Sequence, residues 1–236
     1  ESGQCDLQKD VFNKYPSYII SKIVGVPNSD WEKFSQWADD TFKTFGGNFE
    51  HHSEVILNTQ NELDEYTNNL IISKKQNKGN DLVSMLIDAE SDGQKLLDSE
   101  IQSLIQAVLM AGMDTTRAQL GLIAIMLSER PDLISMLAND VSVEDIIEEC
   151  TRLDSVFKYV MRIASEDIEY NGVLFPKGTI ISPALGVNNY DDLAFENASE
   201  FILDRKGTKG NTLSYGGGIH YCLGASLARA QMQECI

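Results

Sequence analysis

Apolar residues recur every three or four positions through most of the chain up to about residue 159. This spacing is typical of amphipathic helices that turn one face toward a core. Turn residues, most clearly Gly25-Val26-Pro27 and Pro131, separate the periodic stretches. The pattern predicts helices over residues 7–27, 31–45 (ended by Gly46-Gly47) and 53–73, a short helix from Asp81, and further helices over 99–130, 133–137 and 143–159.

The longest of these predicted helices runs to Pro131, which ends it. Ser99 followed by Gln102 fits a capping box at its start. At 1.5 Å per residue such a helix is roughly 45 Å long, enough to cross a domain. It is apolar on most faces, so we expect it to be buried.

After residue 165 the period changes from helix to strand. Ile168 and Tyr170 alternate before Asn171-Gly172, and Val173-Leu174-Phe175 follows, which is a strong signal of a two-residue hairpin. A glycine-rich loop at residues 216–218 then leads into a helix from about Leu223. The predicted fold class is mainly α with a small antiparallel β hairpin region.

The composition excludes several classes of protein. The 236 residues carry 36 acidic and 19 basic side chains, a formal charge of −17, so we expect no nucleic-acid partner. No apolar run approaches the roughly 20 residues that cross a bilayer, so we expect no membrane partner either. Four cysteines without a C-x-x-C pair argue against a disulfide scaffold or a structural zinc site.

Compartment and completeness are further expectations. With no signal-like apolar segment at the start, the expected location is cytoplasmic. The chain opens with Glu1 and closes at Ile236 inside a predicted helix, so we expect a piece of a longer protein.

The most specific chemistry lies in residues 215–224. Cys222 follows a loop of three glycines and stands at a helix start, where free backbone N–H groups and the helix dipole favour a thiolate. The glycines permit positive φ and close approach to a flat group. A thiolate held in this way suits a single axial bond to iron. A buried structural cysteine beside a turn is the alternative interpretation.

A second group interrupts the long apolar helix at residues 111–116. The Thr115 hydroxyl can bond the Ala111 carbonyl one turn back, while Ala111 and Gly112 leave room for a ligand or cofactor. Asp114 beside Thr115 offers a carboxyl and a hydroxyl that could relay a proton. The alternative is a packing notch for a crossing helix, which leaves Asp114 unexplained.

A third pattern, Glu149 and Arg152 on one helix face, allows an ion pair but by itself indicates no function. Together and in this order, the three patterns resemble the cytochrome P-450 family of haem-thiolate monooxygenases, most closely its soluble bacterial members. The cysteine loop F-G-x-G-x-H-x-C-x-G is met at every position except Tyr215, which replaces Phe. The motifs A-G-x-D-T-T and E-x-x-R are complete at residues 111–116 and 149–152. The resemblance implies a truncated P-450-like fold, with residues 1–236 as a single, partial domain.

The resemblance also implies a cofactor, heme b (iron protoporphyrin IX), and a role for each matching residue. Cys222 would be the metal ligand, and Asp114 and Thr115 the catalytic pair that delivers protons during oxygen activation. Other residues implied to contact the cofactor are Ala111, Gly112, Arg162, Tyr215, Gly216, His220 and Gly224, with Arg162 and His220 holding its propionates. Glu149 and Arg152 would be a structural pair that supports the loop.

The chain also departs from the family pattern. An earlier helix with a haem-binding basic residue, the adjoining substrate loop and the strands after the last helix have no counterpart here. No proline follows Arg152, and residues 189–192 stand where N-R-D-P is usual. Glu200 precedes Phe201 where a basic residue often completes the ion-pair network.

The function implied is a monooxygenase that inserts one oxygen atom from O2 into a small apolar organic substrate, with electrons from a ferredoxin- or flavodoxin-type donor. A milder variant uses peroxide or performs a rearrangement. The alternative of another class is a non-catalytic, P-450-like protein-docking module, which would have no need of Asp114 and Thr115. A cysteine hydrolase is more distant, because His220 and Cys222 are only two residues apart in an extended loop.

Overall fold

The computed structural model describes residues 3–45, 48–91, 93–139, 141–203, 205 and 212–236. The chain divides into two compact units, residues 1–121 and 122–236, and the division falls within its longest helix. A single domain over the whole chain therefore stays a prediction. The helix stop expected at Gly46-Gly47 lies outside the described residues.

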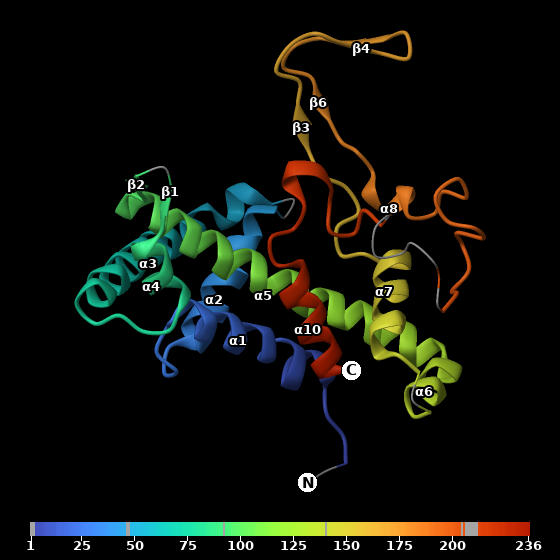
Figure 1. The fold of residues 1–236 in the computed structure, drawn as a ribbon, viewed down its shortest axis with the longest axis horizontal. Coiled ribbons are helices and arrows are strands. Elements are labelled where there is room, and N and C mark those ends of the chain that lie inside the picture. Colours follow the sequence, from blue (N-terminus) through green and yellow to red (C-terminus); the bar gives the residue numbers. More distant parts are fainter. Residues whose placement is uncertain (1–2, 46–47, 92, 140, 204, 206–211) are drawn as a thin grey trace. The chain divides into compact units, whose positions relative to one another are not determined.

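Helices dominate both units, as the apolar spacing predicts (Figure 1). In chain order they are a π-helical turn Gln8–Phe12, α1 Tyr15–Val24, α2 Trp31–Phe42, a 3-10 turn Lys43–Phe45, α3 Phe49–Gln76, α4 Leu82–Asp88, α5 Asp98–Glu129, α6 Pro131–Leu137, α7 Val143–Leu153, α8 Leu185–Asn188, a 3-10 turn Gly218–His220 and α10 Ala225–Cys235. The strands form antiparallel pairs, namely β1 Glu90–Ser91 with β2 Gln94–Lys95, β3 Arg162–Ile163 with β6 Ile180–Ile181, and β4 Ile168–Tyr170 with β5 Val173–Phe175. The predicted fold class is confirmed.

Aromatic side chains hold α2 against α3 in the first unit. Phe34 contacts Trp37 and Tyr66 edge to face, with 4.9 Å between ring centroids in each pair. The Tyr66 hydroxyl also donates to the Asp30 carboxylate at 2.5 Å. Edge-to-face pairs of this kind stabilise a core beyond the area they bury.

The end of α1 and the start of α4 meet at one glycine. Gly25 ends α1 with a φ of 100°, a left-handed conformation that favours glycine. Asp81 lies one residue before α4 and caps it, because its carboxylate accepts the Ser84 N–H at 2.9 Å, and it also pairs with Lys74 at 2.5 Å. A Cβ on Gly25 would lie 2.5 Å from Asp81 Cγ, so backbone conformation and space both require glycine here.

The long helix α5 differs from its prediction at its start and on one face. It begins at Asp98, and the Leu97 N–H is bonded by Glu100 at 2.7 Å, so the capping box of Ser99 and Gln102 is wrong. Ile105, Leu109, Met113 and Leu120 are among its buried residues, whereas Leu104, Ala107 and Ala111 are exposed. The expectation of burial on most faces is therefore wrong for one apolar face.

In the second unit the strand predictions hold and one helix end does not. Tyr170 pairs with Val173 across Asn171-Gly172, whose φ values of 50° and 75° fit a type I′ hairpin turn. Figure 1 shows the β4–β5 hairpin (gold to orange) continuing from the β3–β6 ribbon.

The helix α7 ends at Leu153, not at residue 159. The chain beyond it makes backbone hydrogen bonds to a distant segment, from Val160 N to Pro183 O at 3.1 Å and from Gly186 N to Lys158 O at 3.0 Å. These hydrogen bonds to a distant segment take the place of the i to i−4 bonds of a continued helix. The spacing of apolar residues could not have predicted them, because it reflects only neighbouring positions in the chain.

None of the described helices combines the length and the apolar character needed to cross a bilayer.

Candidate functional site

The loop that carries Cys222 is closed by its own backbone. The Cys222 N–H donates to the Tyr215 carbonyl at 2.9 Å, and the Ala225 N–H donates to the Cys222 carbonyl at 3.3 Å as α10 begins. Gly216 and Gly218 have φ values of 73° and 62°, as expected for glycines that turn the loop. The helix starts two residues later than predicted, so Cys222 lies in the turn that opens α10.

The surroundings of the Cys222 thiol fit a flat apolar group such as haem. The thiol is exposed, so the buried structural cysteine considered from the sequence is wrong. Ile219 is 97% exposed and Leu223 is 92% exposed, two large apolar side chains presented to solvent beside one sulfur. Covering each of them would contribute roughly 1.5–3 kcal/mol. Gly218 and Gly224 have open space where a Cβ would point, so a planar ring could approach the backbone at these two residues.

The predicted partners of carboxylates, Arg162 and His220, are both accessible. Arg162 lies on β3 opposite Ile181, and its guanidinium donates to the Met161 carbonyl at 2.8 Å. His220 ends the 3-10 turn that precedes Cys222. Both side chains are exposed and therefore free to bind an anionic group of a ligand.

The side chain of Arg152 is fully buried in the second unit and binds several of its segments. Its Nε and Nη2 bind the two oxygens of Glu149 at 2.8 and 2.7 Å, so the predicted pair is formed. Its other three N–H groups donate to the carbonyls of Asn189, Ala198 and Glu200 at 2.6, 2.7 and 3.0 Å. All five donors of the guanidinium are used, as a fully buried arginine requires.

Glu149 has further partners, one of which the sequence reading missed. Its Oε1 accepts from the Ile202 N–H at 3.1 Å and from Arg205 Nε at 3.0 Å. Burial alone would raise the pKa of Glu149, but the hydrogen bonds from Arg152, Ile202 and Arg205 hold it below its ordinary value. The third charged member of the network is therefore Arg205. The basic residue that the family pattern led us to seek at position 200 lies five positions later in the chain.

Asn189 connects this network to the cysteine loop. Its side-chain amide donates to the Arg152 carbonyl at 3.1 Å and to Ser214 Oγ at 2.9 Å. Its Oδ1 accepts from the N–H of Leu213, two residues before Tyr215, at 2.9 Å. Asn189 is fully buried, and only its place in the run that stands for N-R-D-P drew attention to it in the sequence.

In the first unit the polar residues of α5 are satisfied nearby. The Thr115 hydroxyl donates to the Ala111 carbonyl at 2.6 Å, as predicted. Asp114 forms an ion pair with Arg117 one turn along, and Arg117 also binds Asp39 on α2. Burial raises the pKa of Asp114 above its ordinary value, although the charge of Arg117 opposes this shift.

Gly112 and Ala111 face different surroundings. A Cβ on Gly112 would lie 2.5 Å from Ile20 Cδ1, so the room at Gly112 is filled by α1, as the packing-notch alternative predicts. Ala111 lies on the exposed face of α5, which Val108 partly shares, whereas Leu109 is buried. The space for a ligand is therefore on the side of Ala111 and Thr115.

Most of the predicted site residues thus fall into two groups, while Arg162 lies apart from both on β3. Residues 111–115 lie on successive turns of α5 in the first unit. The loop of Cys222 lies in the second unit, where Asn189 connects the residues before it to the buried Arg152 network. No signal in the sequence indicated Arg205, and the sequence singled out residues 189–192 without indicating that Asn189 joins the loop to the Arg152 network.

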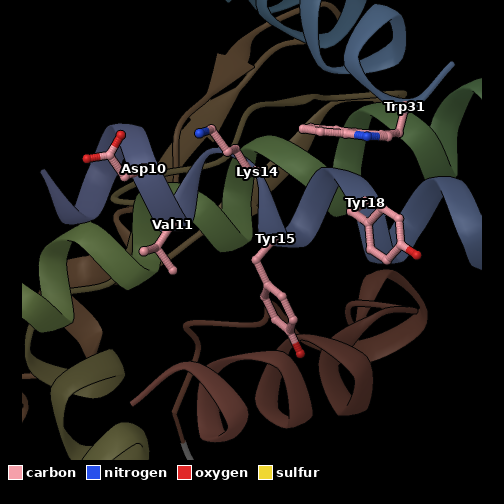
Figure 2. Close-up of a pocket in the computed structure, with 6 residues that line it drawn as sticks. All are labelled: Asp10, Val11, Lys14, Tyr15, Tyr18 and Trp31. Atoms are coloured by element: carbon pink, nitrogen blue, oxygen red, sulfur yellow. The ribbon is translucent and has the colours of Figure 1, made fainter. Parts of the chain in front are cut away.

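A separate groove lies in the first unit (Figure 2). It has a volume of about 300 Å³ and is lined by Asp10, Val11, Lys14, Tyr15, Tyr18 and Trp31. The rings of Tyr18 and Trp31 are edge to face, with centroids 6.3 Å apart. None of the predicted site residues lines it.

Comparison with known proteins supports the resemblance. A family model described as cytochrome P450 matches residues 17–236. Cytochrome P450 133B1 of Xylella fastidiosa (strain 9a5c) is 33% identical over 233 residues, which are 98% of this chain and 57% of that protein. Cyclomarin C epoxidase of Salinispora arenicola (strain CNS-205) is 31% identical over 235 residues, 98% of this chain and 59% of that protein.

A solved structure is similar over nearly the whole chain. The ligand-free structure of cytochrome P450 TbtJ1 has a TM-score of 0.92 and 25% identity, covering 99% of this chain and 62% of that one. The chain therefore spans less than two thirds of the length of these proteins.

Proposed function

This chain belongs to the cytochrome P450 family, and we propose that it acts in a haem-thiolate monooxygenase that inserts one atom of O2 into a small apolar organic substrate. The observation that carries the proposal is the exposure of Cys222 together with that of Ile219 and Leu223, which flank it along the chain. A surface that presents a thiol among apolar groups is expected where a planar apolar cofactor covers it.

The residues that would hold haem b are those of the cysteine loop and its surroundings. Cys222 would bind the iron, Tyr215, Gly216 and Gly224 would shape the loop against the ring, and Arg162 and His220 would bind the propionates by charge-assisted hydrogen bonds. Ala111 and Gly112 would line the oxygen groove, Gly112 through its backbone because Ile20 fills the space at its Cα. When bound, the haem supplies the oxidation chemistry, which thiolate ligation favours.

Asp114 and Thr115 would manage the protons of the reaction. Because the pKa of Asp114 is raised by burial, its carboxyl keeps a proton to higher pH than an exposed aspartate and is better suited to donate it. The hydroxyl hydrogen of Thr115 is directed to Ala111, which leaves its lone pairs to accept a hydrogen bond. We expect the ion pair with Arg117 to hold the Asp114 side chain in place.

Relatives support the reaction class and leave the partners as proposals. The similar cyclomarin C epoxidase is named for adding one oxygen atom to its substrate. For this chain we propose electrons from a ferredoxin- or flavodoxin-type protein in the cytoplasm, with neither a nucleic acid nor a membrane as partner.

The absorption spectrum of the chain loaded with haem, reduced and treated with carbon monoxide, tests the ligand. We expect a red-shifted Soret band that Cys222→Ser abolishes. Cys235→Ser is the matched control, because it removes another thiol of the same unit, at the end of α10, and we expect it to keep the band. Loss of the band in both variants, or its survival in Cys222→Ser, would contradict the assignment. Absence of a haem spectrum in a full-length version, as long as the relatives of this chain, would favour a docking module.

The proton pair is tested by the fate of the reducing equivalents. Thr115→Ala and Asp114→Asn should keep haem but release more peroxide per electron consumed. Val108→Ala, on the same helix and without a polar group, is the control for altered packing. Coupling that is unchanged in Thr115→Ala would remove Thr115 from the proton relay.

A further inference from the structure

A second buried ion pair joins α7 to α10 beside the cysteine loop. Glu148, next to the Glu149 already described, is buried, and both of its carboxylate oxygens bind Arg229 of α10, through Nε and Nη2. The longer of these contacts, from Nη2 to Oε2, is 3.3 Å. Arg229 is therefore tied to the helix that also carries the Arg152 network.

The same guanidinium touches both ends of the loop. It lies 4.1 Å from the ring centroid of Tyr215, where the loop begins. Its Nη1 donates to the Tyr221 hydroxyl at 3.3 Å, one residue before Cys222. Because the Cys222 N–H is bonded to the Tyr215 carbonyl at 2.9 Å, the two ends that Arg229 contacts are also the two ends that meet at the cysteine.

A loop of this composition needs such external fixation. Its three consecutive glycines lose more conformational freedom on ordering than other residues do. Among the described residues of the loop, the backbone bonds within it are few, from Gly216 N to Leu213 O, from Tyr221 N to Gly218 O and from Cys222 N to Tyr215 O. The planar fork of an arginine can bind a carboxylate, stack on a ring and donate to a hydroxyl at once, which a lysine cannot.

We propose that Arg229 is a positioning residue for Cys222, which anchors both ends of the loop 215–222 to Glu148 on α7. Its action is separate from that of Arg152, which reaches the loop only from its upstream side through Asn189 and Ser214. The role of the loop in holding a cofactor rests on the proposed function, but the anchoring itself is a property of the chain alone.

Amide hydrogen exchange of the haem-free chain tests the anchor. Arg229→Lys keeps a charge for Glu148 but loses the stack on Tyr215 and the fork that reaches Tyr221. We expect exchange at residues 216–222 to become about tenfold faster, while amides in the middle of α7 and α10 keep their protection. The proposal would be overturned if the loop amides of Arg229→Lys exchanged as slowly as those of the unmodified chain. It would also be overturned if amide exchange in α7 and α10 became faster by the same factor as in the loop.

A matched control lies in the same unit. Arg130 also binds a carboxylate with two nitrogens, that of Asp132, and lies 5.3 Å from the ring of Phe201, but it contacts no residue of the loop. Arg130→Lys should leave exchange at residues 216–222 unchanged, and faster loop exchange in this variant would also count against the proposal.

The haem-loaded chain gives a second readout. Arg229→Lys should lower the share of the reduced carbon monoxide complex that shows the thiolate band, and Arg130→Lys should not. If a full-length version binds no haem, the proposed function fails, while the exchange experiment still decides whether Arg229 anchors the loop.

Discussion

The two regions that carry the candidate chemistry are built in different ways. Residues 111–115 lie on α5, and their polar groups find partners within one turn or on the adjoining α2, as Thr115 does with Ala111 and Asp114 does with Arg117. The cysteine loop instead depends on Arg152, a fully buried side chain that binds carbonyls as distant along the sequence as Ala198 and Glu200.

This difference follows from where each region obtains its backbone hydrogen bonds. A helix satisfies its own N–H and C=O groups, so α5 can present a hydroxyl and a carboxyl on a rigid frame. An irregular loop has no such ladder, and the segments around it need buried charged groups to satisfy their carbonyls. Substitutions far from Cys222 are therefore expected to matter more than substitutions inside the α5 motif.

The largest expected effect is on the buried arginine. Arg152→Met should lower the free energy of unfolding by about 3–5 kcal/mol, because it leaves Glu149 without its main partner and removes the Arg152 donor from the buried carbonyls of Asn189 and Ala198. Urea denaturation measures the change. Thr115→Val, which removes one hydrogen bond on α5, should cost no more than about 1 kcal/mol. Equal losses in the two variants would refute the contrast between the regions.

A smaller effect is expected where α5 approaches α1. Gly112→Ala should destabilise the chain by about 1–2 kcal/mol. The new methyl group would have to displace Ile20, and the cost of that repacking should exceed the free energy gained from the higher helix propensity of alanine. The same change should cost less in an Ile20→Val background, as a double-mutant cycle would show.

Gly121, on the same helix, is the control for Gly112. There a Cβ would meet only the end of the exposed Gln8 side chain. We expect Gly121→Ala to be neutral or stabilising by up to about 1 kcal/mol. A stabilising Gly112→Ala would show that the close approach of Ile20 is not needed.

The acid dependence of stability should have opposite signs in the two regions. Glu149 has a pKa below its ordinary value of 4.5, so its contribution is complete above that pH and is lost as the pH falls further. Asp114 has a pKa above its ordinary value of 3.8, so stability falls as the pH rises from 3.8 through the folded pKa.

Unfolding midpoints measured between about pH 3 and pH 7 test these signs. Glu149→Gln should flatten the loss of stability toward low pH, besides lowering stability at neutral pH. Asp114→Asn should remove the fall in stability that Asp114 causes as the pH rises. The gain in stability with rising pH that Glu149 contributes should then appear steeper. A flatter curve in Asp114→Asn would mean that its carboxyl is not raised in pKa by burial.

The smallest effect is expected at Tyr215, where the family motif has Phe. Its hydroxyl oxygen is buried and has no hydrogen-bond partner among the described residues. Tyr215→Phe should therefore leave the free energy of unfolding unchanged or raise it by up to about 1 kcal/mol. Tyr221→Phe, which removes an acceptor of Arg229, should not be stabilising. A loss above 1 kcal/mol in Tyr215→Phe would reveal a partner for its hydroxyl.

Local patterns in the sequence were sufficient for much of the fold. The helical spacing predicted the order of the helices, Asn171-Gly172 predicted the hairpin, and the spacing of Glu149 and Arg152 predicted their pairing. The back-bond of Thr115 was predictable for the same reason, since its partner is four residues away. All of these features depend on groups that are neighbours along the chain, where backbone geometry fixes the distance.

Only the tertiary structure decided the features that depend on distant residues. Contacts between residues more than 20 positions apart decide four features: the end of α7 at Leu153, the role of Arg205 at Glu149, the place of Asn189 and the filling of the space at Gly112 by Ile20. The period of apolar residues records which face of an element is buried, but not which other element buries it. The motif was therefore enough to propose a chemistry for Cys222, whereas the buried charges that support its loop became visible only in the tertiary structure.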